Sequence, residues 1–441
     1  MINNSLKTII LAAGESKRIL SSKSKILHTV GGKMIINHVL DNVSKIISKQ
    51  NINIVISPKL NKLKNEYKKI SFSFQRKPLG TAHAVLSSKS FYSKSNQDIL
   101  ILYADNPFID QKIIKEMLNL KKRNNSDIVL LAVNTNNKNE YGRIILNEQQ
   151  KVKKIVEFKD ATTDQKNISL CNSGIMLLKS EVLKKLITKI KSKNKKKEYY
   201  LTDIVELANI NNFKVDYIEG DFLKTLGINT KQELAIAEEY YQNMLRQKFI
   251  SGGVKLLDSK SIFFYFDTKI GNGVVIEPNV FFGPNVIIKD NVHIKAFSHI
   301  EGVKILNNAI IGPFARLRPG TTIGPNSHIG NFVEIKKTYI KKDSKINHLS
   351  YIGDSNIGKN VNIGAGVITC NYDGIKKNKT KIEDNVFVGS NVSLVAPIKL
   401  SKSSIIGAGS VITQSVKENA LAVERNLQRT FPNYRKNRKK K

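Results

Sequence analysis

Residues 11–18, with the sequence LAAGESKR, are the first along the chain that could bind a ligand. They follow an apolar segment that we expect to form a β-strand, and Gly14 would let backbone amides approach an anion. Arg18 and Lys25 would then neutralise a triphosphate. The same residues also suit an ordinary turn between a strand and a helix, so both interpretations stay open for this segment taken alone.

Two further segments could complete a nucleotide site. In the segment QRKPLGTAHA, Gln75 and the pair Gly80 and Thr81 offer amide and backbone groups for the edge of a base. Asp105 follows Tyr103 at the end of another apolar segment, where ligands bind in open α/β sheets. A carboxylate there could hold Mg²⁺ that bridges phosphates, or could equally cap the next helix.

His348, in the segment INHLSYIGD, is the candidate for acid–base chemistry in the second half of the chain. It lies beside Tyr351, between the aliphatic positions Ile346 and Ile352, so its imidazole could face outward into a cleft. A neutral imidazole there would suit general-base chemistry, in which it takes a proton from an attacking amine. A single histidine can also be structural, and the surrounding repeat can serve as a scaffold alone.

A six-residue aliphatic repeat, starting at residue 270, predicts the elements that position His348. This period fits neither a helix nor an ordinary strand and is typical of a left-handed parallel β-helix of hexapeptide repeats. Three six-residue faces would form each coil, with aliphatic side chains stacked inside and residues 370–381 protruding as a loop. The expected inward positions, with slips after 306, 335 and 352, are Ile270, Ile276, Phe282, Ile288, Ile294, Ile300, Leu306, Ile311, Leu317, Ile323, Ile329, Ile335, Ile340, Ile346, Ile352, Ile357, Ile363, Thr369, Ile382, Val388, Leu394, Leu400, Ile406 and Ile412.

The first half alternates short apolar segments with helical ones, which predicts an α/β Rossmann-like domain with a mostly parallel sheet. The segment 230–248 has apolar residues at 234, 237, 241 and 245, so we expect an amphipathic helix between the two halves. We therefore expect a first domain over 1–229, a linker helix over 230–250 and a β-helix domain over 251–441 with a basic tail. The expected strands are 8–13, 53–57, 98–104, 127–133 and 173–178, and the expected helices are 34–49, 81–90 and 110–122.

Composition excludes several classes of protein. Hydrophobic residues make up 41% of the chain, which is enough for packed cores. The apolar runs are too short for a transmembrane helix, and the first residues lack the features of a signal peptide. Cys171 and Cys370 form neither a disulfide framework nor a CxxC metal site. We therefore expect a cytosolic protein without a membrane partner.

The chain is strongly basic, with 72 Lys and Arg against 36 Asp and Glu and a net charge of +36. Nucleic-acid binding requires clustered cations, whereas these lysines are spread along the chain. Lys, Asn and Ile are abundant together, as an A/T-biased genome would encode. We favour that explanation and expect no specific nucleic-acid partner. A basic, nucleic-acid-binding repeat protein is the alternative from a different class.

Several motifs occur in the order seen in sugar-1-phosphate nucleotidyltransferases: LAAG with Arg18 and Lys25, LGTAHA, YAD, Tyr141-Gly142-Arg143, VEFKDA and EYYLTD. With the hexapeptide half, the chain resembles the bacterial bifunctional UDP-N-acetylglucosamine pyrophosphorylase / glucosamine-1-phosphate N-acetyltransferase family from about residue 5 to residue 430. The resemblance implies that the C-terminal half transfers acetyl from acetyl-CoA to glucosamine-1-phosphate. The N-terminal half would then couple N-acetylglucosamine-1-phosphate to UTP and release pyrophosphate.

The resemblance also assigns residues in the first half. It implies that Asp105 and Asn229 bind Mg²⁺ and that Gly142, Glu157 and Asn172 bind the amino-sugar. Asn172 is expected just before a strand. The implied residues for UTP and the UDP-sugar are Leu11, Ala12, Ala13, Gly14, Arg18, Lys25, Gln75, Gly80, Thr81, Tyr103, Asp105, Gly142, Glu157, Asn172 and Asn229.

The first half departs from the family pattern at several positions. The first loop is Gly14-Glu15-Ser16-Lys17-Arg18 where the family has G-x-G-T-R, so a serine replaces a glycine and a glutamate lies near the expected polyanion. Ser24 replaces a proline, Ala104 a glycine and Leu226 an acidic residue. We expect this half to be active but slow. The alternative is an acetyltransferase with a degraded nucleotidyltransferase domain.

In the second half, the resemblance implies that His348 is the general base. Arg318 and Lys336 would bind the sugar phosphate, with Tyr351 and Asn362 as further substrate contacts. Such β-helices pack side by side, which implies a homotrimer with sites between neighbouring subunits. The residues implied for acetyl-CoA are Ala365, Asn371, Tyr372, Ser390, Ala408 and Arg425.

Overall fold

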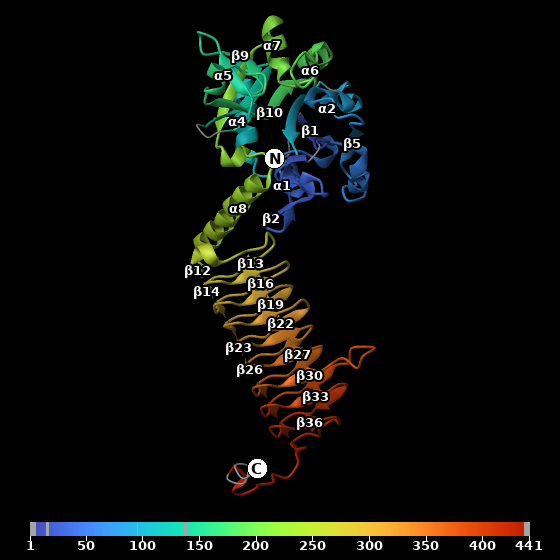
Figure 1. Cartoon of the computed structure of the whole chain (residues 1–441), viewed down its shortest axis with the longest axis vertical. Helices are drawn as coiled ribbons and strands as arrows, with labels where there is room; N and C mark the ends of the chain where they lie inside the picture. The colour runs from blue at the N-terminus through green and yellow to red at the C-terminus, as the bar shows by residue number, and fades with distance from the viewer. Residues whose placement is uncertain (1–5, 15–16, 95, 136–138, 436–441) are drawn as a thin grey trace. The chain divides into compact units, whose positions relative to one another are not determined.

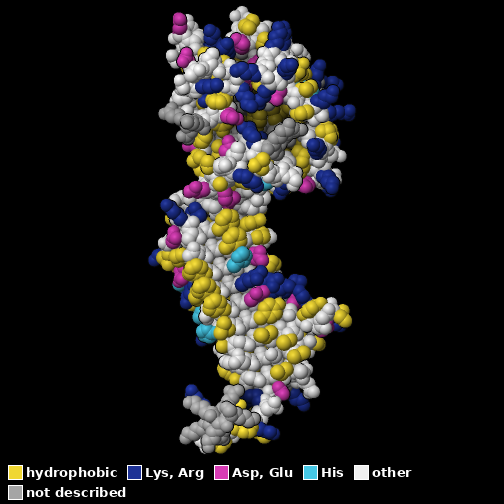
Figure 2. Space-filling view, viewed as in Figure 1, with side chains coloured by type: hydrophobic (Ala, Val, Ile, Leu, Met, Phe, Trp, Pro, Cys, Tyr) yellow, Lys and Arg dark blue, Asp and Glu magenta, His cyan; other side chains and the backbone are white. Residues whose placement is uncertain are grey.

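The computed structural model describes residues 6–14, 17–94, 96–135 and 139–435. The chain forms two compact units, Met1–Tyr241 and Gln242–Lys441 (Figure 1). Among the helices of the described residues, none has the length and hydropathy that a membrane span requires. In Figure 2, Lys and Arg side chains are scattered over the visible face of the N-terminal unit rather than gathered in one place.

The N-terminal unit is built on a sheet of nine strands whose main path runs β11-β7-β10-β6-β1-β4-β5. β1, β4, β5 and β6 are parallel, and β11 is parallel to β7. β10 is antiparallel to both β6 and β7, so the sheet is mixed where a mostly parallel one was expected. The strands are β1 Leu6–Leu11, β4 Ile52–Ile56, β5 Ser71–Phe74, β6 Asp98–Tyr103, β7 Ile128–Asn134, β8 Arg143–Leu146, β9 Val152–Val156, β10 Leu170–Lys179 and β11 Val215–Gly220.

Two hydrophobic cores cover the faces of this sheet, because successive side chains of a strand point to opposite faces. In β1, Ile9 and Leu11 pack in one core, while Leu6 and Ile10 pack in the other. The helix expected over 34–49 ends at residue 44, and the one expected over 81–90 is interrupted at Ser88. The helices are α1 Ile35–Ser44, α2 Thr81–Ser87, α3 Lys89–Tyr92, α4 Gln111–Asn124, α5 Thr163–Lys166, α6 Ser180–Leu186, α7 Asp203–Ile210 and α8 Lys231–Ser251.

α8 is the amphipathic helix that the sequence predicts. Its first turn is closed by a capping box, in which Glu233 Oε2 accepts from the Thr230 amide at 2.8 Å and Thr230 Oγ1 accepts from the Glu233 amide at 3.1 Å. Ala237 and Leu245, two of the four expected apolar positions, are buried. The boundary between the two compact units falls within this helix.

The C-terminal unit is a left-handed parallel β-helix of hexapeptide repeats, as predicted. Three parallel sheets of ten, eight and eight strands run along it, from β12 (Lys255–Leu256), β13 (Lys269–Ile270) and β15 (Phe281–Phe282). Most strands pair with the strand three positions later in the chain, so inward side chains form columns, as Ile276 does with Ile294. This stacking buries aliphatic side chains that no single coil could bury alone.

One predicted inward position is wrong. Ile288 pairs with Ile305, which is fully buried, whereas Leu306 is partly exposed. The register therefore slips between Ile300 and Ile305, one residue earlier than predicted. Two adjacent aliphatic residues fit a six-residue period equally well, and only pairing with the neighbouring coil distinguishes them.

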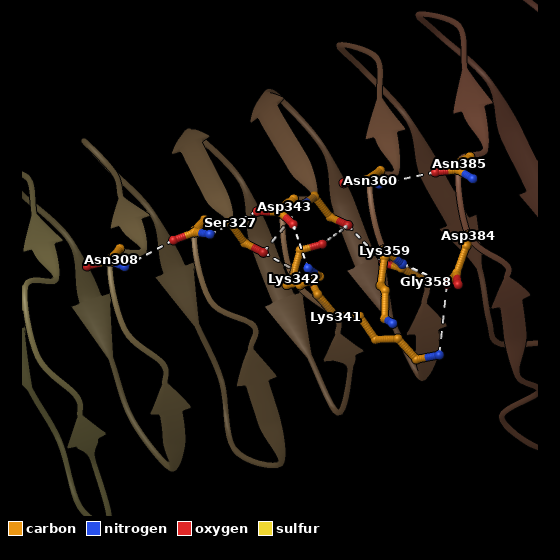
Figure 3. Close-up of polar contacts among 12 residues, drawn as sticks. Asn308, Ser327, Lys341, Lys342, Asp343, Gly358, Lys359, Asn360, Asp384 and Asn385 are labelled. Carbon is orange, nitrogen blue, oxygen red and sulfur yellow. Dashed lines mark hydrogen bonds and ion pairs between the residues drawn. The ribbon is translucent and has the colours of Figure 1, made fainter.

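A ladder of amide and carboxylate side chains follows one corner of the β-helix (Figure 3). Asn308 donates to Asn326 at 3.1 Å, Asn326 donates to Asp343 at 2.9 Å, and Asn360 donates to Asn385 at 3.2 Å. All five have φ between 56° and 60°. Asn and Asp adopt this left-handed conformation more readily than other side chains, which explains why they occupy the corner.

Candidate active sites

Lys25, Asp105 and Asn229 meet at the carboxyl edge of the N-terminal sheet. Asp105 directly follows β6, and Asn229 lies just before α8. The Lys25 ammonium contacts Asp105 Oδ2 and lies 2.7 Å from Asn229 Oδ1. Two oxygen atoms from distant parts of the chain therefore converge on one cation position. Of the two roles that the sequence allowed for Asp105, helix capping falls instead to Asp110, which accepts from the Ile113 amide at the start of α4.

Arg18 makes an ion pair of 2.9 Å with Glu140, and both side chains are exposed. Such a pair contributes about 0–1 kcal/mol to stability, so a phosphate can displace it. A Cβ on Gly14 would meet no atom within 4 Å, which leaves this backbone open to a ligand. The predictions made for Glu15 and Ser16 fall outside the described residues.

Leu11, Ala12 and Ala13 form the buried end of β1 and the start of the loop that follows it. The Ala12 amide donates to Val55 O of the neighbouring strand at 2.8 Å. Because their side chains are buried, these residues can offer a ligand little besides backbone groups.

Gln75, Gly80 and Thr81, the residues expected at the base, are brought together at the start of α2. Gln75 Nε2 donates to Gly80 O at 2.9 Å, and Thr81 Oγ1 accepts from the Leu201 amide at 2.9 Å. Gly80 has φ +109°, and a Cβ there would lie 2.5 Å from Tyr199 O. Glycine at this position is therefore required by the packing of the protein itself.

Gly142, Glu157 and Asn172, expected at the amino-sugar, also form one cluster. The Asn172 amide donates to Gly142 O at 2.8 Å, and a Cβ on Gly142 would lie 3.6 Å from Glu157 Oε2. Burial raises the pKa of Glu157, and the Thr202 hydroxyl, which donates to it at 2.9 Å, opposes this shift. Asn172 Oδ1 is buried without a hydrogen-bond partner in the described structure. A buried, unpaired amide oxygen beside a carboxylate suits a polar ligand.

The placement expected for Asn172 is wrong. It lies inside β10, paired with Ala132 of β7, rather than before a strand. The polar residues around it interrupt the apolar pattern, but the backbone ladder continues until a register shift between Asn172 and Met176. Tyr103 lies nearby, since a Cβ on Gly174 would be 2.7 Å from its ring, and burial raises its pKa.

Two other residues in this unit, Arg143 and Leu226, have structural roles that the sequence analysis did not predict. Arg143 is only 4% exposed and donates to Asn139 Oδ1, at 3.0 Å, and to Lys166 O, at 3.2 Å. It therefore fixes the segment that carries Gly142, and its place in the Tyr-Gly-Arg motif is the signal that sequence reasoning left unused. Leu226, where the family pattern suggested an acidic residue, is buried in a hydrophobic cluster.

In the C-terminal unit, His348 belongs to a column of residues that strand register defines. It ends β26 (Lys345–His348), pairs with Asn331 of β23 (His328–Asn331), and its Nδ1 lies 2.8 Å from Asn331 Oδ1. Since Ile346, Ile363, Val388 and Ile406 pair in turn, the residues two positions after each also stack. These are His348, Ala365, Ser390 and Ala408.

This column joins the expected base to three of the residues expected at acetyl-CoA. Small side chains along it leave room for an extended ligand beside the imidazole. Asn331, which orients the ring of His348, was missed by sequence reasoning. Only the repeat register, and not a motif, could have indicated it.

A second column carries positive charge. Arg318 makes an ion pair of 2.6 Å with Glu334, and Lys336 lies at the equivalent position of the next coil, after Ile335, which pairs with Leu317. The close approach of the Lys377 ammonium is the main cause that lowers the pKa of Lys336, and the Arg318 guanidinium lowers it further. Three neighbouring cations suit a phosphate. Lys377, in the protruding loop, was not among the predicted residues, although its position inside the insertion was a signal.

The insertion at 370–381 folds back on itself through a bridge between Tyr372 and Lys377. Asn371 is buried and donates to Asp354 at 2.5 Å, whereas Tyr372 is exposed. Tyr351 lies beside this loop, since a Cβ on Gly353 would be 2.7 Å from both Tyr351 Oη and Asn371 Nδ2.

Two predicted contacts lie farther along the coils. Asn362 starts β29 (Asn362–Ile363) and pairs with Lys345 on one side and Phe387 on the other. Arg425 is exposed after the last coil, and its Cδ is 3.7 Å from the position of a Cβ on Gly409.

Comparison with known proteins agrees with this organisation. The chain matches the family described as Nucleotidyl transferase over residues 7–222, the GMPPB C-terminal domain over 299–399 and the Bacterial transferase hexapeptide (six repeats) over 267–302. It is 43% identical over 430 residues to the Bifunctional protein GlmU of Paramagnetospirillum magneticum, covering 97% of this chain and 95% of the relative. It is 41% identical over 466 residues to the protein of the same name from Buchnera aphidicola, covering 100% and 99%. The resemblance found in the sequence is thereby confirmed, and the chain belongs to the GlmU family of bifunctional proteins.

Proposed function

We propose that each compact unit carries the residues for one of two successive reactions, and that a neighbouring subunit completes the acetyl-transfer site. The protein is a bifunctional enzyme that acetylates glucosamine-1-phosphate from acetyl-CoA and transfers uridylyl from UTP to N-acetylglucosamine-1-phosphate. The acetyl transfer belongs to the C-terminal unit and the uridylyl transfer to the N-terminal unit. The convergence of separate polar clusters within each unit supports this division.

In the N-terminal unit, a phosphate oxygen of N-acetylglucosamine-1-phosphate attacks the α-phosphorus of UTP, and the bond to the β-phosphate breaks to release pyrophosphate. Arg18 and Lys25 bind the phosphates, and Gln75, Gly80 and Thr81 hold the uracil. Gly142, Glu157 and Asn172 bind the amino-sugar. Both substrates are anions, so the enzyme needs cations that neutralise their charge and contacts that align them for attack. No covalent intermediate on the enzyme is required.

Asp105 and Asn229 would hold the divalent cation, Mg²⁺, that nucleotidyl transfer generally needs. Their oxygen atoms already converge on the Lys25 ammonium, so this donor set accepts a cation at one position. Both are hard oxygen ligands, which suit Mg²⁺. When bound, the ion would supply charge neutralisation at the phosphates.

In the C-terminal unit, the amine of glucosamine-1-phosphate attacks the thioester carbonyl of acetyl-CoA. His348 Nε2 takes the proton from the attacking nitrogen, while Asn331 holds Nδ1 and so fixes the ring. Coenzyme A then leaves as the thiol. Arg318, Lys336 and Lys377 bind the sugar phosphate, and the column of Ala365, Ser390 and Ala408 with Asn371, Tyr372 and Arg425 binds acetyl-CoA.

We further propose that the protein works in the cytoplasm as a homotrimer, in which neighbouring β-helices complete each acetyl-transfer site. Hexapeptide-repeat proteins pack side by side, and this association would cover exposed side chains of the β-helix. Its substrates are small phosphorylated sugars, UTP and acetyl-CoA, with no specific nucleic-acid partner.

The decisive experiment is pyrophosphate release by the purified protein with UTP, N-acetylglucosamine-1-phosphate and Mg²⁺. The observation that carries the proposal is the convergence of Lys25, Asp105 and Asn229 at the strand edge. Turnover that depends on the metal would support it. Absence of release, in protein that still consumes acetyl-CoA with glucosamine-1-phosphate, would favour the alternative of an acetyltransferase with a degraded partner domain.

A further inference from the structure

A cavity of about 750 Å³ opens in the N-terminal unit beside the residues expected to bind UTP. Ala13, Gly14 and Gln75 line it, so it includes both the phosphate loop and the residue expected at the base. This volume is in the range of small-molecule sites.

Three cations also line this cavity: Lys23, Lys59 and Arg76. All three side chains are exposed, and within the described residues no carboxylate lines the cavity or pairs with any of them. The two cations that the family resemblance assigns to phosphates differ in this respect, because Arg18 is paired with Glu140 and Lys25 with Asp105. The unneutralised positive charge of the cavity therefore comes from residues outside the resemblance.

The topology explains why these cations share one cavity. Lys59 lies in the 3-10 helix η4 (Pro58–Asn65), just after β4, and Arg76 follows β5. Lys23 precedes the 3-10 helix η2 (Lys25–Leu27) in the segment after β1. β1, β4 and β5 are parallel neighbours, so their carboxyl ends lie along one edge. Ligands bind at such edges in open α/β sheets.

We propose that Lys23, Lys59 and Arg76 bind the polyphosphate chain of the nucleoside triphosphate and raise affinity with each added phosphate. The proposal rests on the uridylyl transfer proposed above and adds three residues to its site. A cation without a carboxylate partner loses no ion pair when a polyanion enters, whereas Arg18 and Lys25 must exchange one partner for another. These three cations thus attract the nucleotide before the paired cations rearrange.

The test replaces Lys23, Lys59 and Arg76 by alanine, singly and together, in the full chain. Calorimetry with Mg²⁺ would then compare the binding of UTP, UDP, UMP and uridine. Lys62→Ala and Lys77→Ala are the matched controls, because both lysines are exposed and close in sequence but do not line the cavity. Unchanged circular dichroism and thermal unfolding would show that the N-terminal unit of each variant is folded, which acetyl transfer in the C-terminal unit would not report.

We expect the triple variant to bind UTP at least about tenfold more weakly, on the scale of a few charge-assisted contacts at exposed positions. The loss of affinity should be largest for UTP, smaller for UDP and UMP, and absent for uridine. Lys59→Arg, which keeps the positive charge, should retain much of the UTP affinity that Lys59→Ala loses. In turnover, KM for UTP should rise while kcat stays within about twofold, since these contacts are the same in ground and transition states.

Unchanged UTP affinity in the triple variant would overturn the inference, as would an equal loss for all four ligands, which would indicate contacts to the nucleoside. An effect of the same size in the control variants would also overturn it, because overall charge would then suffice. If the wild type neither bound UTP nor released pyrophosphate, the proposed function would fail and the inference with it. That outcome is distinguishable, since it appears before any substitution is made.

Discussion

In the N-terminal site, the side chains proposed to bind phosphate and metal already contact one another before any ligand binds. Lys25 occupies the position between Asp105 and Asn229 where a divalent ion is proposed to bind. A metal ion held by Asp105 Oδ2 and Asn229 Oδ1 would compete with the Lys25 ammonium for these oxygen atoms, and Lys25 would then be available to a phosphate.

Replacement of Lys25 by methionine should strengthen metal binding although it weakens catalysis. The variant removes a competing charge while keeping the length of the side chain, so Mn²⁺ affinity without nucleotide should rise several-fold. Electron paramagnetic resonance of free Mn²⁺ would measure this. Lys33→Met is the control, since Lys33 pairs with Asp41 away from the proposed ligands, and equal changes in both variants would contradict the prediction.

At the scale of elements, the corner ladder of the β-helix depends on residues that tolerate the left-handed conformation. Asn326, at φ +56°, both accepts from Asn308 and donates to Asp343. Asn326→Ala should cost about 1–2 kcal/mol, because alanine is strained in this conformation. Asn326→Gly should recover most of that loss. Thermal unfolding of the two variants would measure both, and equal destabilisation would instead assign the cost to the lost hydrogen bonds.

The packing of α1 against α8 should make the N-terminal unit less stable in acid. His38 of α1 bonds to Val30 O at 2.9 Å and packs against Tyr241 and Phe108, and burial lowers its pKa to about 4. The unfolded chain binds the proton near pH 6.5, so stability is complete above that pH and is lost as pH falls toward 4.

From this pKa shift, the unfolding free energy should be about 2 kcal/mol lower at pH 5 than at pH 7.5. His38→Gln keeps a donor for Val30 O but cannot titrate. Urea unfolding of both proteins across this range should therefore give a flatter profile for the variant. Parallel profiles would show that other groups cause the acid sensitivity.

For the whole molecule, the two sets of site residues lie in separate compact units, so the activities should be separable. His348→Ala should lower acetyl transfer by about 10²–10⁴-fold, the usual contribution of a general base, and leave pyrophosphate release intact. Asp105→Ala should do the reverse.

Mixing the two variant proteins should restore formation of UDP-N-acetylglucosamine from glucosamine-1-phosphate, because the acetylated intermediate can diffuse from one protein to the other. Chromatography of the nucleotide product would follow this, with each variant alone as the control. Loss of both activities in His348→Ala would instead show that this histidine supports folding or assembly.

The sequence by itself determined the repeat architecture, the α/β character of the first half and the residue types at both sites. A six-residue period and alternating apolar segments are local patterns that packing must satisfy, so they predict elements directly. The family motifs added the residues around Asp105 and His348.

Only the tertiary structure decided how distant residues meet. The sheet was expected to be mostly parallel, and the antiparallel direction of β10 was missed because an apolar strand has the same pattern in either orientation. The contact of Lys25 with Asp105 and Asn229, and the column of His348, Ala365, Ser390 and Ala408, depend on pairing between segments far apart in the chain. Such pairing is set by strand order and register across the whole unit, which no local spacing of residues contains.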